Sequence, residues 1–257
     1  MRKAVLAAVV TAITVGTTAP ADAAHSWGGY HWARTANPFS LRLGDNVNST
    51  WDPFLRTTST DWSVSTVLDT VVRSGSTTGS TCAPTSGTVQ VCNASYGANG
   101  WLGIAQVWVS GTHIVQGTTK LNDTYFNSSP YNTTAWRNLV MCQEVGHTLG
   151  LNHQDENFTN ANLGSCMDYT NSPGTNQRPN AHDYQQLLSI YGHADTTSTL
   201  AAVSSGSSTN GASAPRNGLA RAEWGELDRG EERSRSMSRY HRRLPDGTEV
   251  FSFVIWA

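Results

Sequence analysis

The chain has 257 residues, of which 38% are hydrophobic, 9% aromatic and 14% charged. This composition excludes a coiled coil, a collagen-like repeat and a chain that is disordered throughout. The formal net charge of -2 provides no basic excess for binding phosphate backbones, so nucleic acid is not an expected partner.

The first 24 residues have the three parts of a secretory signal peptide. Two basic residues at 2–3 precede an apolar run over 4–15, and small residues at 21–23 favour cleavage near Ala23 or Ala24. The apolar run is shorter than the ~20 residues that a membrane-spanning helix needs, and no later stretch reaches that length. We therefore expect a secreted, extracellular protein that has no membrane partner. A buried helix is the alternative interpretation of this segment.

Residues 25–195 alternate short β-prone runs with turns, and two helices follow them. Enrichment in β-branched and aromatic residues predicts strands at 39–47, 67–73, 87–96, 102–109 and 113–121. Apolar periodicity and stop signals predict helices at 51–62, 134–149 and 181–191, the last two ended by Gly150 and Gly192. This order of elements predicts an α+β fold.

The composition changes after Asp195. Residues 196–237 begin with a run of Ser, Thr, Ala, Gly and Asn and continue with mixed charges, which predicts a flexible linker. Two predicted strands, 238–244 and 248–256, follow and are joined by Pro245-Asp246-Gly247. We therefore expect a C-terminal hairpin over 238–257, with a frayed tail as the alternative.

An even number of cysteines in an exported chain predicts disulfides, and this chain has four. Three pairings are possible. Cys82 and Cys92 bracket a short loop, which favours their pairing and leaves Cys142 with Cys166. Free thiols and a cysteine metal site are the alternatives, although the spacing fits no CxxC pattern.

The segment 142–153, CQEVGHTLGLNH, carries the residues with chemistry. Gln143 and His147 are four apart on the predicted helix, so one helix face presents both side chains to a single metal ion. Gly150 allows the helix to end, so that His153 can return toward the same point. Glu144 is placed to contact a metal-bound water without being a ligand. Elsewhere, His113 and His182 are interpreted as ordinary polar residues rather than ligands.

The motif QEVGHTLGLNH, followed by SCMDY at 165–169, resembles the HExxHxxGxxH motif and Met-turn of the metzincin zinc endopeptidases, most closely the matrixin-like enzymes. The resemblance covers roughly residues 39–192. It implies a twisted, mainly five-stranded sheet with an active-site helix and a C-terminal helix, to which the predicted hairpin is added. It also implies that 102–109 is an edge strand that holds an extended substrate.

The same resemblance assigns roles to individual residues. It implies that His147 and His153 bind zinc, that Glu144 is the general base, and that Met167 lies beneath the metal. Tyr169 matches a tyrosine that contacts the metal or the transition state in some branches of the family.

Gln143 stands where the family has its first histidine, and three possibilities follow. The amide oxygen binds zinc as a weaker donor, so that the ion is held less tightly while its water stays acidic. Alternatively, Gln143 only donates or accepts a hydrogen bond, and zinc has two histidines plus water or another donor such as Asp155. In the third possibility no metal binds.

Together these observations predict a secreted, monomeric zinc metalloendopeptidase that acts on a protein or peptide substrate. The predicted metal site is Gln143, His147 and His153, with Glu144 as base and then acid and Tyr169 at the oxyanion. The alternative is a catalytically silent binding protein that keeps the fold and the peptide groove.

Overall fold

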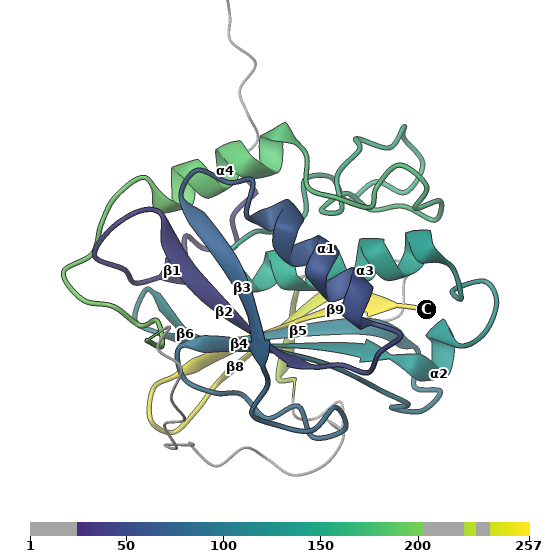
Figure 1. Ribbon diagram of the computed structural model, residues 1–257, viewed down its shortest axis with the longest axis horizontal. Coiled ribbons are helices and arrows are strands. Elements are labelled where there is room, and N and C mark those ends of the chain that lie inside the picture. The colour runs from purple at the N-terminus through teal and green to yellow at the C-terminus, as the bar shows by residue number, and fades with distance from the viewer. Residues whose placement is uncertain (1–24, 203–223, 230–236) are drawn as a thin grey trace, which may run out of the picture.

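A computed structural model describes residues 25–202, 224–229 and 237–257. The predicted signal peptide and most of the predicted linker lie outside these residues. The described chain forms one large mixed sheet with helices packed on one of its faces (Figure 1). The predicted α+β class is confirmed.

Six strands before the long helix form the first half of the sheet, and five of them lie where the sequence predicts strands. β2, β4 and β6 are parallel neighbours in the order β3-β2-β4-β6-β5, whereas β5 runs antiparallel to β6. The short β1 pairs with β6. The bounds are β1 His31–Trp32, β2 Phe39–Asn46, β3 Leu68–Ser74, β4 Thr88–Ala94, β5 Trp101–Ser110 and β6 His113–Asn122.

Three C-terminal strands continue the same sheet beyond β5. They are β7 Glu226–Arg229, β8 Met237–Arg243 and β9 Glu249–Trp256, in the order β5-β9-β8-β7. The predicted hairpin strands are therefore present, but they extend the sheet to nine strands in the described residues instead of standing beside five.

β7 lies inside the segment that the sequence predicts as a flexible linker. Trp224, which is 3% exposed, explains the difference, because its ring packs against Tyr240 at 5.3 Å and Trp256 at 5.8 Å. The overall composition of the segment, which is rich in charges of both signs, does not indicate that a single tryptophan within it is buried.

The helices are α1 Asp52–Trp62, α2 Asp123–Phe126, α3 Thr134–Thr148 and α4 Ala181–Tyr191. The side chain of Thr133 accepts a hydrogen bond from the Trp136 backbone at the start of α3, and Asn180 and Asp183 form a capping box at the start of α4. In the described part of the chain, no helix has both the length and the apolar character needed to span a membrane.

Three buried tryptophans hold α3 against the rest of the core. The indole N–H of Trp27 donates to the carbonyl of His147, that of Trp32 to Thr148, and that of Trp62 to Cys142, at 2.9, 2.9 and 3.1 Å. The His147 carbonyl also accepts from the Gly150 backbone N–H at 3.1 Å, so the bond from Trp32 to the Thr148 carbonyl is the one that satisfies a group left unpaired at the end of the helical ladder.

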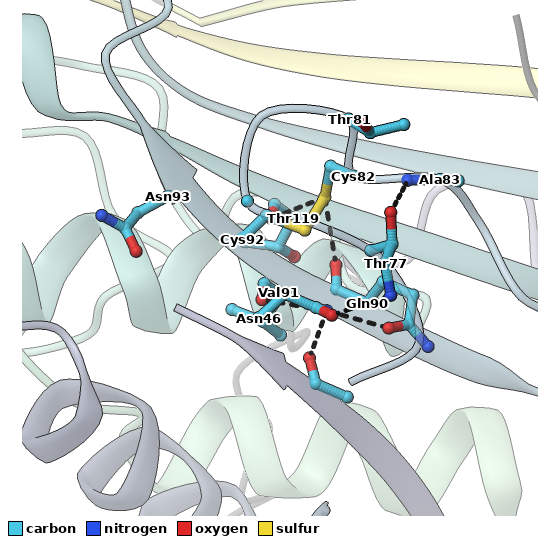
Figure 2. Close-up of a disulfide and its surroundings, with 12 residues drawn as sticks. Asn46, Thr77, Thr81, Cys82, Ala83, Gln90, Val91, Cys92, Asn93 and Thr119 are labelled. Atoms are coloured by element: carbon cyan, nitrogen blue, oxygen red, sulfur yellow. Dashed lines mark hydrogen bonds between the residues drawn. A yellow bond between two sulfur atoms is a disulfide. The ribbon is translucent and has the colours of Figure 1, made fainter. Parts of the chain in front are cut away.

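Both predicted disulfides are present, and no cysteine is free in the described residues. Cys82–Cys92 fastens a loop to β4, and Figure 2 shows the Cys82 sulfur directed at the backbone oxygens of Gln90 and Thr119, each 3.7 Å away. Cys142–Cys166 joins α3 to the segment that precedes α4.

Candidate functional site

Two histidines, one at the end of α3 and one after it, face each other. His147 lies in the last turn of α3, and Gly150 takes a left-handed conformation (φ 96°) that lets the chain turn back and bring His153 to it. Their Nε2 atoms are 3.0 Å apart. Both side chains are buried, with His147 0% and His153 8% exposed.

The hydrogen bond of the His147 ring leaves the lone pair of its Nε2 directed at the His153 ring. His147 Nδ1 lies 2.9 Å from the Leu151 carbonyl and donates to it, so its Nε2 is unprotonated in the neutral ring. His153 Nδ1 faces the Glu156 carboxylate at 3.5 Å. Burial lowers the pKa of both imidazoles, which favours their neutral forms. Two nitrogens that share a tetrahedral zinc ion lie about 3.3 Å apart, so the observed spacing suits a common cation.

Glu144 is completely buried between α3 and β5. A Cβ atom at Gly103 would lie 2.7 Å from its Oε1, so β5 carries a glycine where the carboxyl group packs. Neither oxygen makes a hydrogen bond of ordinary geometry within the described residues. Burial raises the pKa of Glu144 well above its usual value, and the backbone of Ala105 lowers it by less. The environment therefore favours the protonated carboxyl group.

Gln143 lies one turn before His147 and is 3% exposed. Its Nε2 has no hydrogen-bond partner in the described part of the chain. The side chain lines a cavity of about 390 Å³ together with Tyr169, Ile255 and Trp256 among others. A buried amide N–H group without an acceptor is unfavourable, so the Nε2 side of Gln143 favours binding of a hydrogen-bond acceptor there.

The turn around Met167 packs directly under α3. A Cβ atom at Gly146 would lie 2.5 Å from the Met167 sulfur, so this glycine allows the thioether to approach the helix backbone. Tyr169 follows, with its ring centroid 4.4 Å from that of His153. Tyr169 therefore contacts the predicted ligand His153 and lines the same cavity as the predicted ligand Gln143.

Asp155 is less well placed as a substitute donor. Its two carboxylate oxygens accept hydrogen bonds from the Asn157 backbone and the Asn160 side chain, within its own loop.

β9 covers the site from the side of β5. The sequence predicts a substrate-holding edge at 102–109, but β5 pairs with β9 along its length, so that prediction is wrong for the described form. Phe253 lies opposite Ala105, and its ring stacks on His147 with centroids 4.3 Å apart. The physical reason is that an unpaired strand edge accepts any strand of suitable pattern, and alternate side chains of β9 are apolar and join the core.

A second group of histidines lies outside the motif. The sequence analysis interprets His113 as an ordinary polar residue, whereas the structure places it with His31, His193 and Asp195. Residue spacing could not reveal this group, because its members come from three distant segments and only His193 and Asp195 are neighbours in sequence.

No family model matches the sequence, and neither does any curated protein. Among solved structures, the chain is similar to high choriolytic enzyme 1, a hatching enzyme zinc-protease from the medaka fish Oryzias latipes, at 12% identity and a TM-score of 0.36 over 65% of this chain and 96% of that one. It is also similar to myroilysin, at 12% identity and a TM-score of 0.34 over 68% and 97% of the two chains. At these values neither likeness bears on the chemistry, which depends on the residues of the site itself.

Proposed function

We propose that the chain is a secreted zinc-dependent endopeptidase of metzincin type that hydrolyses peptide bonds in protein or peptide substrates. The observation that carries this proposal is the pair of imidazole Nε2 atoms 3.0 Å apart, together with the buried carboxyl group of Glu144 three residues before His147 on the same helix. The signal-peptide pattern and the two disulfides support export.

The donors present in the site suit zinc. His147 is oriented by the Leu151 carbonyl in the way that metal-binding imidazoles are commonly held. Gln143 supplies the proposed third donor through its amide oxygen, and we expect weaker retention than with three imidazoles. When bound, zinc would supply a Lewis acid that polarises a peptide carbonyl and acidifies water.

Glu144 is the proposed proton carrier. Its carboxylate takes a proton from the attacking water and returns it to the leaving amine. A pKa raised by burial suits the second step, in which the protonated group delivers its proton, whereas the first step requires the carboxylate, whose charge a bound cation would stabilise. Tyr169, which contacts His153, is the proposed hydrogen-bond donor to the developing oxyanion.

The described form is closed, since a substrate strand would have to displace β9 from β5. Full burial of Glu144 and the glutamine at position 143 favour a second candidate, a catalytically silent protein that binds peptides or proteins.

Zinc content and peptide cleavage, measured on the full chain, test the proposal. Cleavage is followed in the parent and in a Phe253→Ala background, so that closure by β9 does not hide activity. We expect Glu144→Gln to keep zinc and to lose cleavage by a factor of roughly 10²–10⁴. The double variant His147→Gln/His153→Gln should lose one zinc per chain, whereas the control His182→Gln should lose none.

Gln143→His should bind zinc about tenfold more tightly, a gain of about 1.4 kcal/mol.

Two results would contradict the enzyme. If the double histidine variant binds as much zinc per chain as the parent, the proposed metal site is wrong. If zinc is lost from that variant but no cleavage depends on Glu144 in either background, the silent binding protein is the better description.

A further inference from the structure

Three histidines and one aspartate from separate segments meet at the start of β6. Parallel pairing of β1 with β6 sets His31 beside His113, and the chain after α4 brings His193 and Asp195 to the same place. The side chains of His31 and Asp195 are 9% and 12% exposed, whereas those of His113 and His193 are 31% and 51% exposed. The cluster is therefore anchored on its inner side and open to solvent on its outer side.

The potential ligand atoms converge. Asp195 Oδ1 lies 3.4 Å from His31 Nε2, 3.3 Å from His113 Nε2 and 3.7 Å from His193 Nε2. The Nε2 atoms of His193 and His31 are 3.2 Å apart. Ligand atoms at 2.0–2.2 Å from a tetrahedral zinc ion lie about 3.3–3.6 Å from one another, so these four separations are close to those of a filled site. The ligand atoms of His31, His113 and Asp195 all lie within 4.8 Å of one another, and His193 is near two of these three residues.

The surroundings hold the inner two residues in orientations that suit a metal ion. His31 Nδ1 is 3.0 Å from the Gly29 carbonyl, so donation to that oxygen leaves a lone pair on Nε2 that points into the cluster. Arg34 binds the other carboxylate oxygen of Asp195 through Nη1 at 2.8 Å and through its backbone N–H at 3.2 Å. Oδ1 is thereby left facing the imidazoles.

The ion pair of Asp195 with Arg34 accounts for only part of this arrangement. Arg34 already neutralises Asp195, so the carboxylate has no need of three imidazoles. A neutral His31 imidazole would also bring its lone pair against a carboxylate oxygen at 3.4 Å, which is repulsive unless a proton or a metal ion lies between them.

We propose that His31, His113, His193 and Asp195 bind a divalent transition metal ion, with zinc as the best match, at a structural site distinct from the His147 and His153 pair. Three imidazoles and one carboxylate suit zinc, whereas calcium and magnesium prefer sites built from oxygen. His31, His113 and Asp195 supply three ligands, and rotation of the half-exposed His193 side chain supplies the fourth, which leaves no open position, as in structural zinc sites. The bound ion fastens β1 and the segment after α4 to β6, where Asp195 and Thr199 already donate backbone hydrogen bonds to Arg34 and Ala33.

The test uses the full chain, stripped of metal with a chelator and then titrated with Zn²⁺ or with Co²⁺ as a spectroscopic probe. The key variant is His113→Gln/His193→Gln, because both side chains are partly exposed and their replacement leaves the core intact. His182→Gln/His241→Gln is the matched control at two histidines outside both sites.

We expect the His113→Gln/His193→Gln variant to lose one zinc per chain, together with the strong visible absorption of tetrahedral Co²⁺ and the rise in melting temperature on zinc addition. The matched control should lose none of these. The variant His147→Gln/His153→Gln should keep this ion, so the inference stands or falls independently of the proposed protease. Unchanged zinc content in the key variant, or a parent chain whose cobalt spectrum lacks a tetrahedral component, would overturn it, as would an equal response to Ca²⁺.

Discussion

Glu144 packs against a position on β5 that has no side chain. A methyl group at Gly103 would come within 2.6 Å of a Val140 methyl and 2.7 Å of the Glu144 carboxyl oxygen. These distances are too short for real contacts, so the Val140 and Glu144 side chains, or the strand and helix that carry them, must shift.

Gly103→Ala should therefore lower the free energy of unfolding by about 1–3 kcal/mol and displace the carboxyl group from the site. Urea unfolding measures the first effect, and Glu144-dependent cleavage measures the second. Gly174→Ala is the control, because no atom lies within 4 Å of its added methyl and its backbone is not left-handed. Equal stability of the two variants would show that the packing at Gly103 is looser than the distances indicate.

At this scale the sequence predicts what lies within one local motif. The spacing of the motif, with Gly150 ending the helix, predicts that His147 and His153 meet, and the structure places them together. It does not predict His31 or Asp195, whose association depends on how β1, β6 and the segment after α4 come together in the fold. Local periodicity carries no information on such distant contacts.

At the scale of elements, the hairpin of β8 and β9 controls access to the site. Phe253 faces α3 and stacks on His147, whereas Val254 points to the opposite face of the sheet, into the cluster around Trp224. Phe253 and Val254 are both buried, but only Phe253 contacts the site. Comparing variants at the two positions therefore separates an effect on the site from a general weakening of the packing of β9.

Phe253→Ala should speed the removal of zinc from the His147 site by a chelator roughly tenfold, and should increase peptide cleavage, because less apolar surface holds β9 in place. Val254→Ala should change both rates much less. Stopped-flow measurement with a coloured chelator follows the first rate, and unfolding curves record the loss of global stability in each variant. Equal acceleration in the two variants would mean that β9 opens only as part of the whole sheet.

Most elements were predictable because their patterns are local. The strands at β2 to β6 and the helices α1, α3 and α4 lie within a few residues of their predicted bounds. The partner of β9 was not predictable, since its alternation of apolar residues fits any free strand edge. β7 was missed because its main anchor is the buried ring of Trp224, which lies just before the strand.

At the scale of the whole molecule, the buried residues His25 and Asp183 have opposite effects on folding stability as pH changes. Burial lowers the pKa of His25 to about 4 and raises that of Asp183 to about 6, and their side chains are 3.6 Å apart. Since the folded pKa of His25 is below the unfolded value of 6.5, its contribution is complete above pH 6.5 and is lost as pH falls toward 4. For Asp183 the folded pKa is the higher one, so stability falls as pH rises from 3.8 to 6.

We therefore expect a nearly flat stability profile between pH 4 and 6 for this pair in the parent chain. His25→Gln should leave the Asp183 slope, so that stability falls with rising pH. Asp183→Asn should leave the opposite slope. Each slope amounts to a few kcal/mol at most, on the order of 3 kcal/mol. Denaturant unfolding at several pH values measures both, and slopes of the same sign in the two variants would refute the opposition.

The indole groups that donate to the carbonyls of α3 also provide a spectroscopic probe of the site at the end of this helix. The indole N–H groups of Trp27 and Trp32 donate to the carbonyls of His147 and Thr148. The indole N–H of Trp256 donates instead to the Ser238 hydroxyl, between β9 and β8. A positive charge held by His147 would polarise the first two acceptors and shift their nuclear magnetic resonance signals, with the third as an internal reference. The indole N–H signals therefore measure whether the His147 site is occupied, and no added label is needed.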